Sequence, residues 1–145
     1  MVVPLEELGL AVKQLQYRHH RTLDIRLAPL GTTLVQWDAL RVISRNPDAS
    51  LHRLAQLTFQ TDQSFGALAG RLIERGLIER IAGAGRALHH HLTPAGEVLL
   101  SEGQIVYDEV ISKSFAPLSA MERDTLHDLL ARLLDGPGPY GSPVK

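Results

Sequence analysis

Three consecutive histidines, His89 to His91, form the densest group of metal-capable and titratable side chains in this sequence. On an extended strand the side chains alternate, so His89 and His91 would share one face and His90 would take the other. A zinc site would need further ligands, yet the chain has no cysteine and no histidine pair at helical spacing after Pro94. We therefore interpret the segment as a polar, half-exposed strand and expect no metal site.

No catalytic motif accompanies these histidines. The sequence contains no GxSxG nucleophile elbow, no HExxH motif and no cysteine nucleophile. The stretch GAGR at 83–86 precedes a predicted strand, whereas a dinucleotide-binding fingerprint must open a helix. We expect no enzymatic activity and no cofactor.

Two adjacent helices are predicted on the N-terminal side of the histidines. Ser50 can cap the first, whose apolar residues recur at helical spacing. Thr61 can cap the second, which runs to Arg75 and is ended by Gly76. The inner face of this second helix is expected to consist of Phe65, Leu68 and Leu72.

A hairpin and a new helix are predicted next. β-forming residues at 77–81 and 88–92 flank a glycine turn, and Thr93 with Pro94 provides a cap and a first helical residue. The order helix, turn, helix and hairpin is that of a winged helix-turn-helix, which places one helix in a DNA groove. We therefore expect a mainly α fold of the α+β winged-helix class, with the winged helix-turn-helix over 33–96.

Long amphipathic helices are predicted on both flanks, over 5–28 and 97–134. These helices are longer and more apolar than a compact winged helix can cover, so we expect them to be N- and C-terminal dimerisation helices. The alternative is that their apolar faces pack only within one monomer. The tail over 135–145 has almost no core residues and is expected to be flexible.

Composition agrees with one helical domain. The chain has 145 residues, of which 44% are hydrophobic and only 5% aromatic. The absence of cysteine, of a basic signal peptide and of any membrane-length apolar run favours a reducing cytoplasm and no membrane partner. The net charge is −1, but residues 50–92 carry five Lys and Arg against three Asp and Glu, which permits DNA binding.

The segment TTLVQWDALRVISRNPDASLHRLAQLTFQTDQSFGALAGRLIERGLIER, followed by Arg86 and then LTPAGEVLL, resembles the MarR family of bacterial transcriptional regulators. The resemblance extends over nearly the whole chain to FAPLSAMERDTLHDLLARLL, which is similar to the family's closing dimerisation helix. It implies a homodimer that binds double-stranded DNA at a pseudo-palindromic operator. It also implies a repressor that is released by a small aromatic or anionic ligand.

The resemblance assigns DNA contacts to the start of the second helix. The matching positions are Thr61, Asp62, Gln63, Ser64, Gly66 and Ala67. Gln63 is the best base reader, since its amide can donate to and accept from an adenine edge, and Ser64 is next. Asp62 is better placed to orient than to contact phosphate, and Ala67 replaces a residue that is basic in many relatives.

Further residues are DNA-contact candidates. Arg71 lies outside the apolar stripe and can reach a phosphate, whereas Arg75 is more suited to the helix dipole. Arg86 in the wing is expected in the minor groove, although no acidic neighbour holds it. If His89 or His91 faces DNA, its protonation should strengthen binding toward pH 6, and equal affinity at pH 6 and pH 8 in matched salt would exclude that role.

A ligand pocket is expected between the dimerisation helices and the winged domain. Its candidate residues combine apolar bodies with polar tips: His19, His20, Trp37, Arg41 and Tyr107. Each has a structural alternative, such as a core role for Trp37 or a simple ion pair of Arg41 with Asp38 or Asp48. The rival function is a winged-helix protein-interaction module that has lost strong DNA binding.

Overall fold

The structure is a computed structural model and describes residues 2–82 and 88–136. In chain order its elements are α1 (Leu5–Leu27), the 3-10 turn η1 (Ala28–Leu30), α2 (Leu34–Arg45), α3 (Leu51–Leu57), α4 (Asp62–Glu74), β1 (Ile78–Ala82), β2 (Leu88–Leu92), α5 (Pro94–Phe115) and α6 (Ala120–Leu134). The expected fold class is confirmed. The glycine turn, Arg86 and the tail from residue 137 onward lie outside the described residues.

Most helices begin at a hydroxyl side chain that accepts a hydrogen bond from a backbone N–H three residues later. These capping residues are Thr33, Ser50, Thr61, Thr93 and Ser119. Each cap satisfies a donor that the helix itself cannot use and stabilises the helix by about 1 kcal/mol. The predicted starts at Ser50, Thr61 and Thr93 are therefore confirmed.

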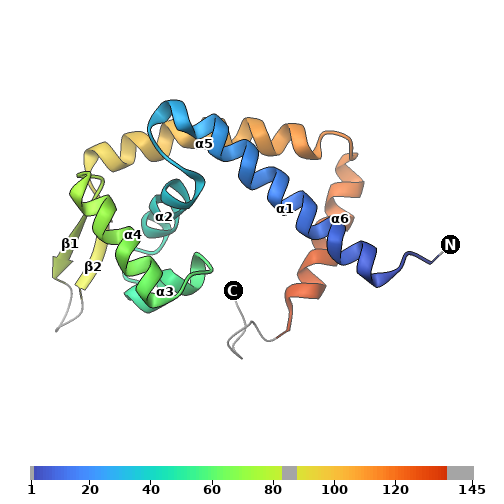
Figure 1. Ribbon diagram of the computed structural model, residues 1–145, viewed down its shortest axis with the longest axis horizontal. Coiled ribbons are helices and arrows are strands. Elements are labelled where there is room, and N and C mark those ends of the chain that lie inside the picture. Colours follow the sequence, from blue (N-terminus) through green and yellow to red (C-terminus); the bar gives the residue numbers. More distant parts are fainter. Residues whose placement is uncertain (1, 83–87, 137–145) are drawn as a thin grey trace.

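Helix α5 is long and connects two parts of the molecule (Figure 1). At one end lies a lobe of α2, α3, α4 and the two-stranded sheet, and at the other end lies α6 (Figure 1). Helix α1 packs along α5 and extends beyond it toward the N-terminus. The flanking helices thus project from the lobe, and α6 contains no buried residue.

Two apolar clusters hold these parts together. The larger one fills the lobe and includes Leu40, Leu54 and Phe65. The smaller one lies where α1, α2 and α5 meet and consists of Leu23, Leu27, Trp37 and Val110. Leu30 and Leu100 pack against both clusters, so apolar packing continues without a break from the lobe to helices α1 and α5.

The sheet is a single antiparallel hairpin in which Ile78 pairs with Leu92 and Arg80 pairs with His90. It is fastened to α5 through Thr93, whose N–H donates to the Leu77 carbonyl at 3.0 Å. Gly96 makes this approach possible, because a Cβ at that position would lie 2.0 Å from the same carbonyl oxygen. The glycine of the LTPAG motif is therefore required for close packing of α5 against the start of the wing.

Candidate nucleic-acid interface and ligand pocket

The turn between α3 and α4 sets the direction of α4. Phe59 has a φ of 58°, and its N–H donates to Gln56 while the Gln60 N–H donates to Ala55. This pair of bonds is a Schellman motif, which ends a helix with one left-handed residue, usually glycine. A bulky aromatic residue in that conformation is uncommon, and nothing in the sequence analysis identified it.

Helix α4 has one buried face and one exposed face. Phe65, Leu68 and Leu72 are buried in the lobe, as predicted from their spacing. The opposite face is exposed and carries Gln63, Ser64, Ala67 and Arg71. Ser64 Oγ donates to the Gln60 side chain at 3.1 Å. The exposed face therefore offers an amide, a hydroxyl and a guanidinium, all of which can bond to base edges or phosphates.

The other residues at the ends of α4 have contacts within the chain. Asp62 accepts from His52 Nδ1 at 2.8 Å, and the Thr61 hydroxyl caps the helix. Gly66 is half-buried, with Leu51 beside it. Arg75 donates to Gln36 at 2.8 Å and to the Gly31 carbonyl at 2.7 Å. Arg75 thus ties the end of α4 to the start of α2.

In the wing, the strand places the three histidines as the alternation predicts. His90 is buried and only 3% exposed, whereas His89 and His91 are half-buried on the other face. His89 Nδ1 lies 3.8 Å from the exposed carboxylate of Asp48. Within the described part of the chain no group of three or more His, Asp or Glu side chains is arranged to hold a metal ion.

We predict that His90→Leu stabilises the protein by about 1 kcal/mol at pH 7, because neither ring nitrogen has a hydrogen-bond partner among the described residues. Burial lowers the pKa of His90, and Arg80, His89 and His91 lower it further. Since the unfolded chain then binds protons more readily, stability should fall as the pH drops below about 6.5.

The measurement is urea unfolding of wild type and His90→Leu at pH 7.5 and 5.5. The loss of stability on acidification should be smaller in the variant. His127→Gln removes an imidazole whose side chain is 83% exposed, so this control should retain the wild-type pH dependence. A pH dependence that is identical in His90→Leu and wild type would contradict the assignment.

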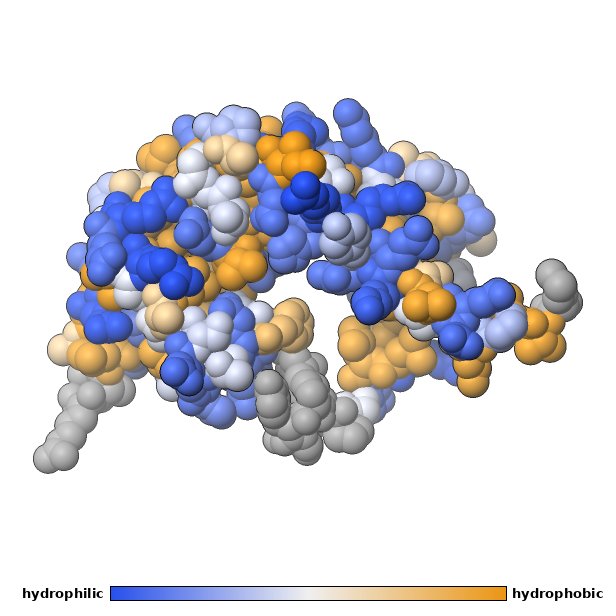
Figure 2. All heavy atoms as spheres, in the orientation of Figure 1, coloured by the Kyte–Doolittle hydropathy of each residue, from blue (hydrophilic) through white to orange (hydrophobic). Residues whose placement is uncertain are grey.

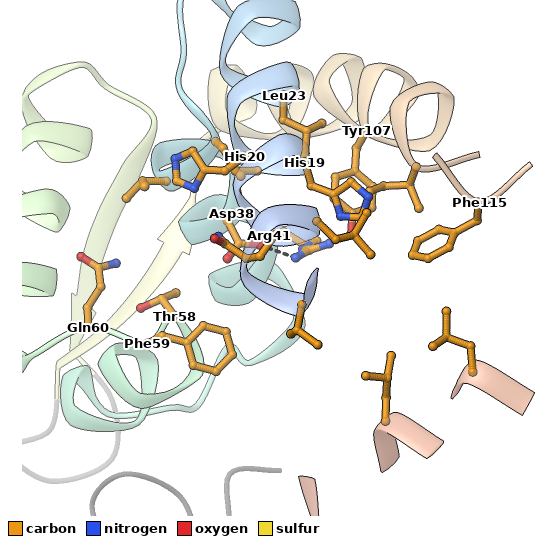
Figure 3. A pocket seen from close by; sticks show the side chains of 18 of the residues that line it. His19, His20, Leu23, Asp38, Arg41, Thr58, Phe59, Gln60, Tyr107 and Phe115 are labelled. Atoms are coloured by element: carbon orange, nitrogen blue, oxygen red, sulfur yellow. Dashed lines mark hydrogen bonds and ion pairs between the residues drawn. The ribbon is translucent and has the colours of Figure 1, made fainter. Parts of the chain in front are cut away.

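A pocket of about 820 Å³ lies between α1, α2, α5, α6 and the turn before α4 (Figure 3). Four of the five predicted ligand-pocket residues line it: His19, His20, Arg41 and Tyr107. Trp37 is wholly buried and lies behind Arg41 and Tyr107, stacked on the Tyr107 ring at 5.1 Å. The sequence analysis missed Phe59 and Phe115, because they are brought here only by tertiary folding.

Arg41 is the central polar group of this pocket. Its guanidinium carbon lies 5.1 Å from the centroid of Trp37 and 5.0 Å from that of Tyr107, which are cation–π distances. The same guanidinium donates to Asp38 in the preceding helical turn (Figure 3). Burial alone would lower the pKa of Arg41, but Asp38 and Tyr107 together raise it, so the side chain stays charged.

The two histidines of the pocket differ in their surroundings. His19 is hydrogen-bonded through Nε2 to Ser114 and meets the edge of Phe115 at 5.5 Å. Burial, together with Arg18, lowers the pKa of His19, which favours a neutral imidazole near pH 7. His20 Nε2 lies 3.4 Å from Asp24 in the next turn of α1.

The model of the MarR family matches residues 30–87 of the chain. A probable transcriptional regulator from Pseudomonas aeruginosa, known from its crystal structure, is 32% identical, with 90% of this chain and 99% of that one covered and a TM-score of 0.77. A MarR family protein of Mycobacterium tuberculosis, crystallised with salicylic acid, is 26% identical over 91% of this chain and 97% of its own, with a TM-score of 0.72.

The same mycobacterial protein, described as an HTH-type transcriptional repressor, also matches in sequence. The repressor, from strain H37Rv, is 29% identical over 109 residues, which are 74% of this chain and 78% of the repressor. Among the described residues no helix combines the length and the apolar character needed to cross a bilayer.

Proposed function

Since the chain belongs to the MarR family of winged helix-turn-helix transcriptional regulators, we propose that it is a homodimeric repressor that binds a pseudo-palindromic operator and releases it when a small ligand binds. The observation that carries this proposal is the two-faced α4 helix. Its buried face fixes it to the lobe, and its opposite face leaves Gln63, Ser64 and Arg71 exposed for a major groove.

Dimerisation is supported by the apolar side chains that α1 and α6 leave uncovered. Leu5 and Leu8 on α1 and Leu133 and Leu134 on α6 are all more than half exposed in the single chain. Apolar residues gather over α6 and the N-terminal part of α1, away from the lobe (Figure 2). A twofold dimer built on these helices would present two α4 helices roughly 34 Å apart, the spacing of adjacent major-groove turns.

Release by a ligand is supported by what the pocket touches. Its walls come from the flanking helices α1, α5 and α6 and also from Phe59, Gln60 and Ser64. The last three belong to the turn and first residues of α4, so a bound molecule would contact both the dimerisation helices and the DNA-facing helix. The salicylic acid complex of the mycobacterial relative favours a small aromatic or anionic ligand.

A footprint with DNA from the chain's own upstream region, repeated across a salt series, tests the proposal. Protection of a pseudo-palindrome that weakens steeply with salt supports the repressor. Loss of protection on addition of aromatic compounds supports ligand release. No binding at low salt, combined with a stable heteromeric partner in pull-down experiments, would instead support the protein-interaction module.

Gln63→Ala is expected to weaken operator binding about tenfold and to relax the preference at one base pair per half-site, since the amide would read an adenine edge. Arg71→Ala should weaken binding to all sequences alike and reduce the salt slope by about one per subunit, because it would remove a phosphate contact. Mobility-shift titrations with the operator and a scrambled duplex measure both. Equal losses on both duplexes for Gln63→Ala would contradict its role as a base reader.

A further inference from the structure

We propose that the pocket selects uncharged aromatic compounds over aromatic carboxylates, because Asp38 already neutralises its one permanent cation. The inference rests on the proposed function, which leaves open whether the ligand is an uncharged aromatic or an anionic compound, and it decides between these two classes. Among the described residues that line the pocket, Asp38 and Arg41 are the only Asp, Glu, Lys or Arg side chains. The wall therefore carries one negative and one positive charge and has no net charge.

Arg41 already has partners inside the pocket, one of them a carboxylate. Its guanidinium lies beside the stacked rings of Trp37 and Tyr107, and its Nη2 donates to Asp38. The side chains of Asp38 and Arg41 are only 24% and 23% exposed, so solvent screens their interaction weakly. A ligand carboxylate that reached the guanidinium would face the Asp38 carboxylate and would have to displace it or share its partner.

The histidines do not supply a replacement cation. His19 is bonded to the uncharged Ser114, and its surroundings favour the neutral ring. His20 lies 3.4 Å from Asp24, a carboxylate on the same helix face, so its nearest charged neighbour is an anion. Asp24 also accepts from the Leu34 N–H at 2.8 Å, which holds that carboxylate in place.

The rest of the wall suits an aromatic ring with an uncharged polar group. Phe59 is 79% exposed, and its ring, Phe115 and Tyr107 all border the pocket (Figure 3). A ring bound among them would cover apolar surface that water now contacts. Thr58 and Gln60 provide a hydroxyl and an amide that can bond to a ligand amide or hydroxyl. An unpaired carboxylate in the same place would lose its hydration without compensation.

The test is calorimetric titration of the full chain at pH 7.5 with 2-naphthamide and with 2-naphthoate, which have the same shape and differ in charge. Wild type should bind the amide about tenfold more tightly, the effect expected of one uncompensated charge. Asp38→Asn keeps the side-chain shape and frees Arg41, so 2-naphthoate should gain about tenfold and the preference for the amide should disappear. Asp48→Asn removes a carboxylate that is 93% exposed and absent from the wall, and should leave the wild-type preference intact.

Tighter binding of 2-naphthoate to wild type, equal binding of the two probes, or no binding of either at millimolar concentration would overturn the inference. So would an Asp38→Asn protein that is folded by its melting curve and gains nothing for the carboxylate. Mobility shifts with upstream DNA on the same preparations separate the two proposals. Salt-sensitive DNA binding without the probe preference rejects this inference and leaves the repressor, whereas the probe preference without DNA binding rejects the repressor alone.

Discussion

Replacing Gly103 by alanine is expected to destabilise the protein by about 3 kcal/mol, the upper range for overpacking a core. A Cβ at this position of α5 would lie 2.2 Å from Nε1 and 2.3 Å from Cδ1 of Trp37. Trp37 cannot easily move away, because it is wholly buried and its Nε1 donates to the Leu100 carbonyl at 3.1 Å. Relief of the clash must separate α5 from α2. This separation would also disturb the smaller apolar cluster, which lies where α1, α2 and α5 meet.

Urea unfolding measured by fluorescence gives this free energy directly, since Trp37 is the only tryptophan. Gly70→Ala is the matched control in α4, where an added Cβ meets no atom within 4 Å. That substitution should stabilise the protein by about 0.5 to 1 kcal/mol, because alanine favours helix more than glycine does. A Gly103→Ala protein within about 1 kcal/mol of wild type would show that the α2–α5 contact is softer than the packing indicates.

Leu133→Glu is expected to convert the proposed dimer to a monomer and to weaken operator binding at least about a hundredfold, because one subunit reaches only one half-site. Leu133 is 74% exposed in the single chain, and α6 buries none of its residues without a partner. In a dimer interface the introduced carboxylate would lose its hydration against the apolar surface of the other subunit. The monomer itself should remain folded, since residue 133 lies outside both apolar clusters.

Light scattering coupled to size exclusion measures the mass, and mobility shifts measure the affinity. Val98→Glu makes the same chemical change at an apolar side chain that is 57% exposed at the lobe end of α5. This control should keep the dimer mass and most of the affinity. A Leu133→Glu protein that still has the mass of a dimer would place the interface elsewhere.

Local chemistry made the helices and their starts predictable from the sequence. A cap such as Thr61 acts on a backbone N–H three residues away, and the buried face of α4 follows from the spacing of Phe65, Leu68 and Leu72. These signals depend on residues within two helical turns of one another, so they survive without knowledge of the tertiary structure. The winged helix-turn-helix order was determined at this level.

Only the tertiary structure decided how the candidate residues meet. Arg41 could have paired with Asp38 or Asp48 from sequence alone, and the folded chain directs it to Asp38, beside Trp37 and a tyrosine 66 positions further along. Phe59 joins the pocket because a Schellman turn holds it at positive φ, a conformation that its residue type does not predict. The sequence by itself determined that one helix has a face suited to DNA. The charge balance of the pocket depends instead on which distant surfaces pack together. Periodicity within one helix carries no information about such long-range packing.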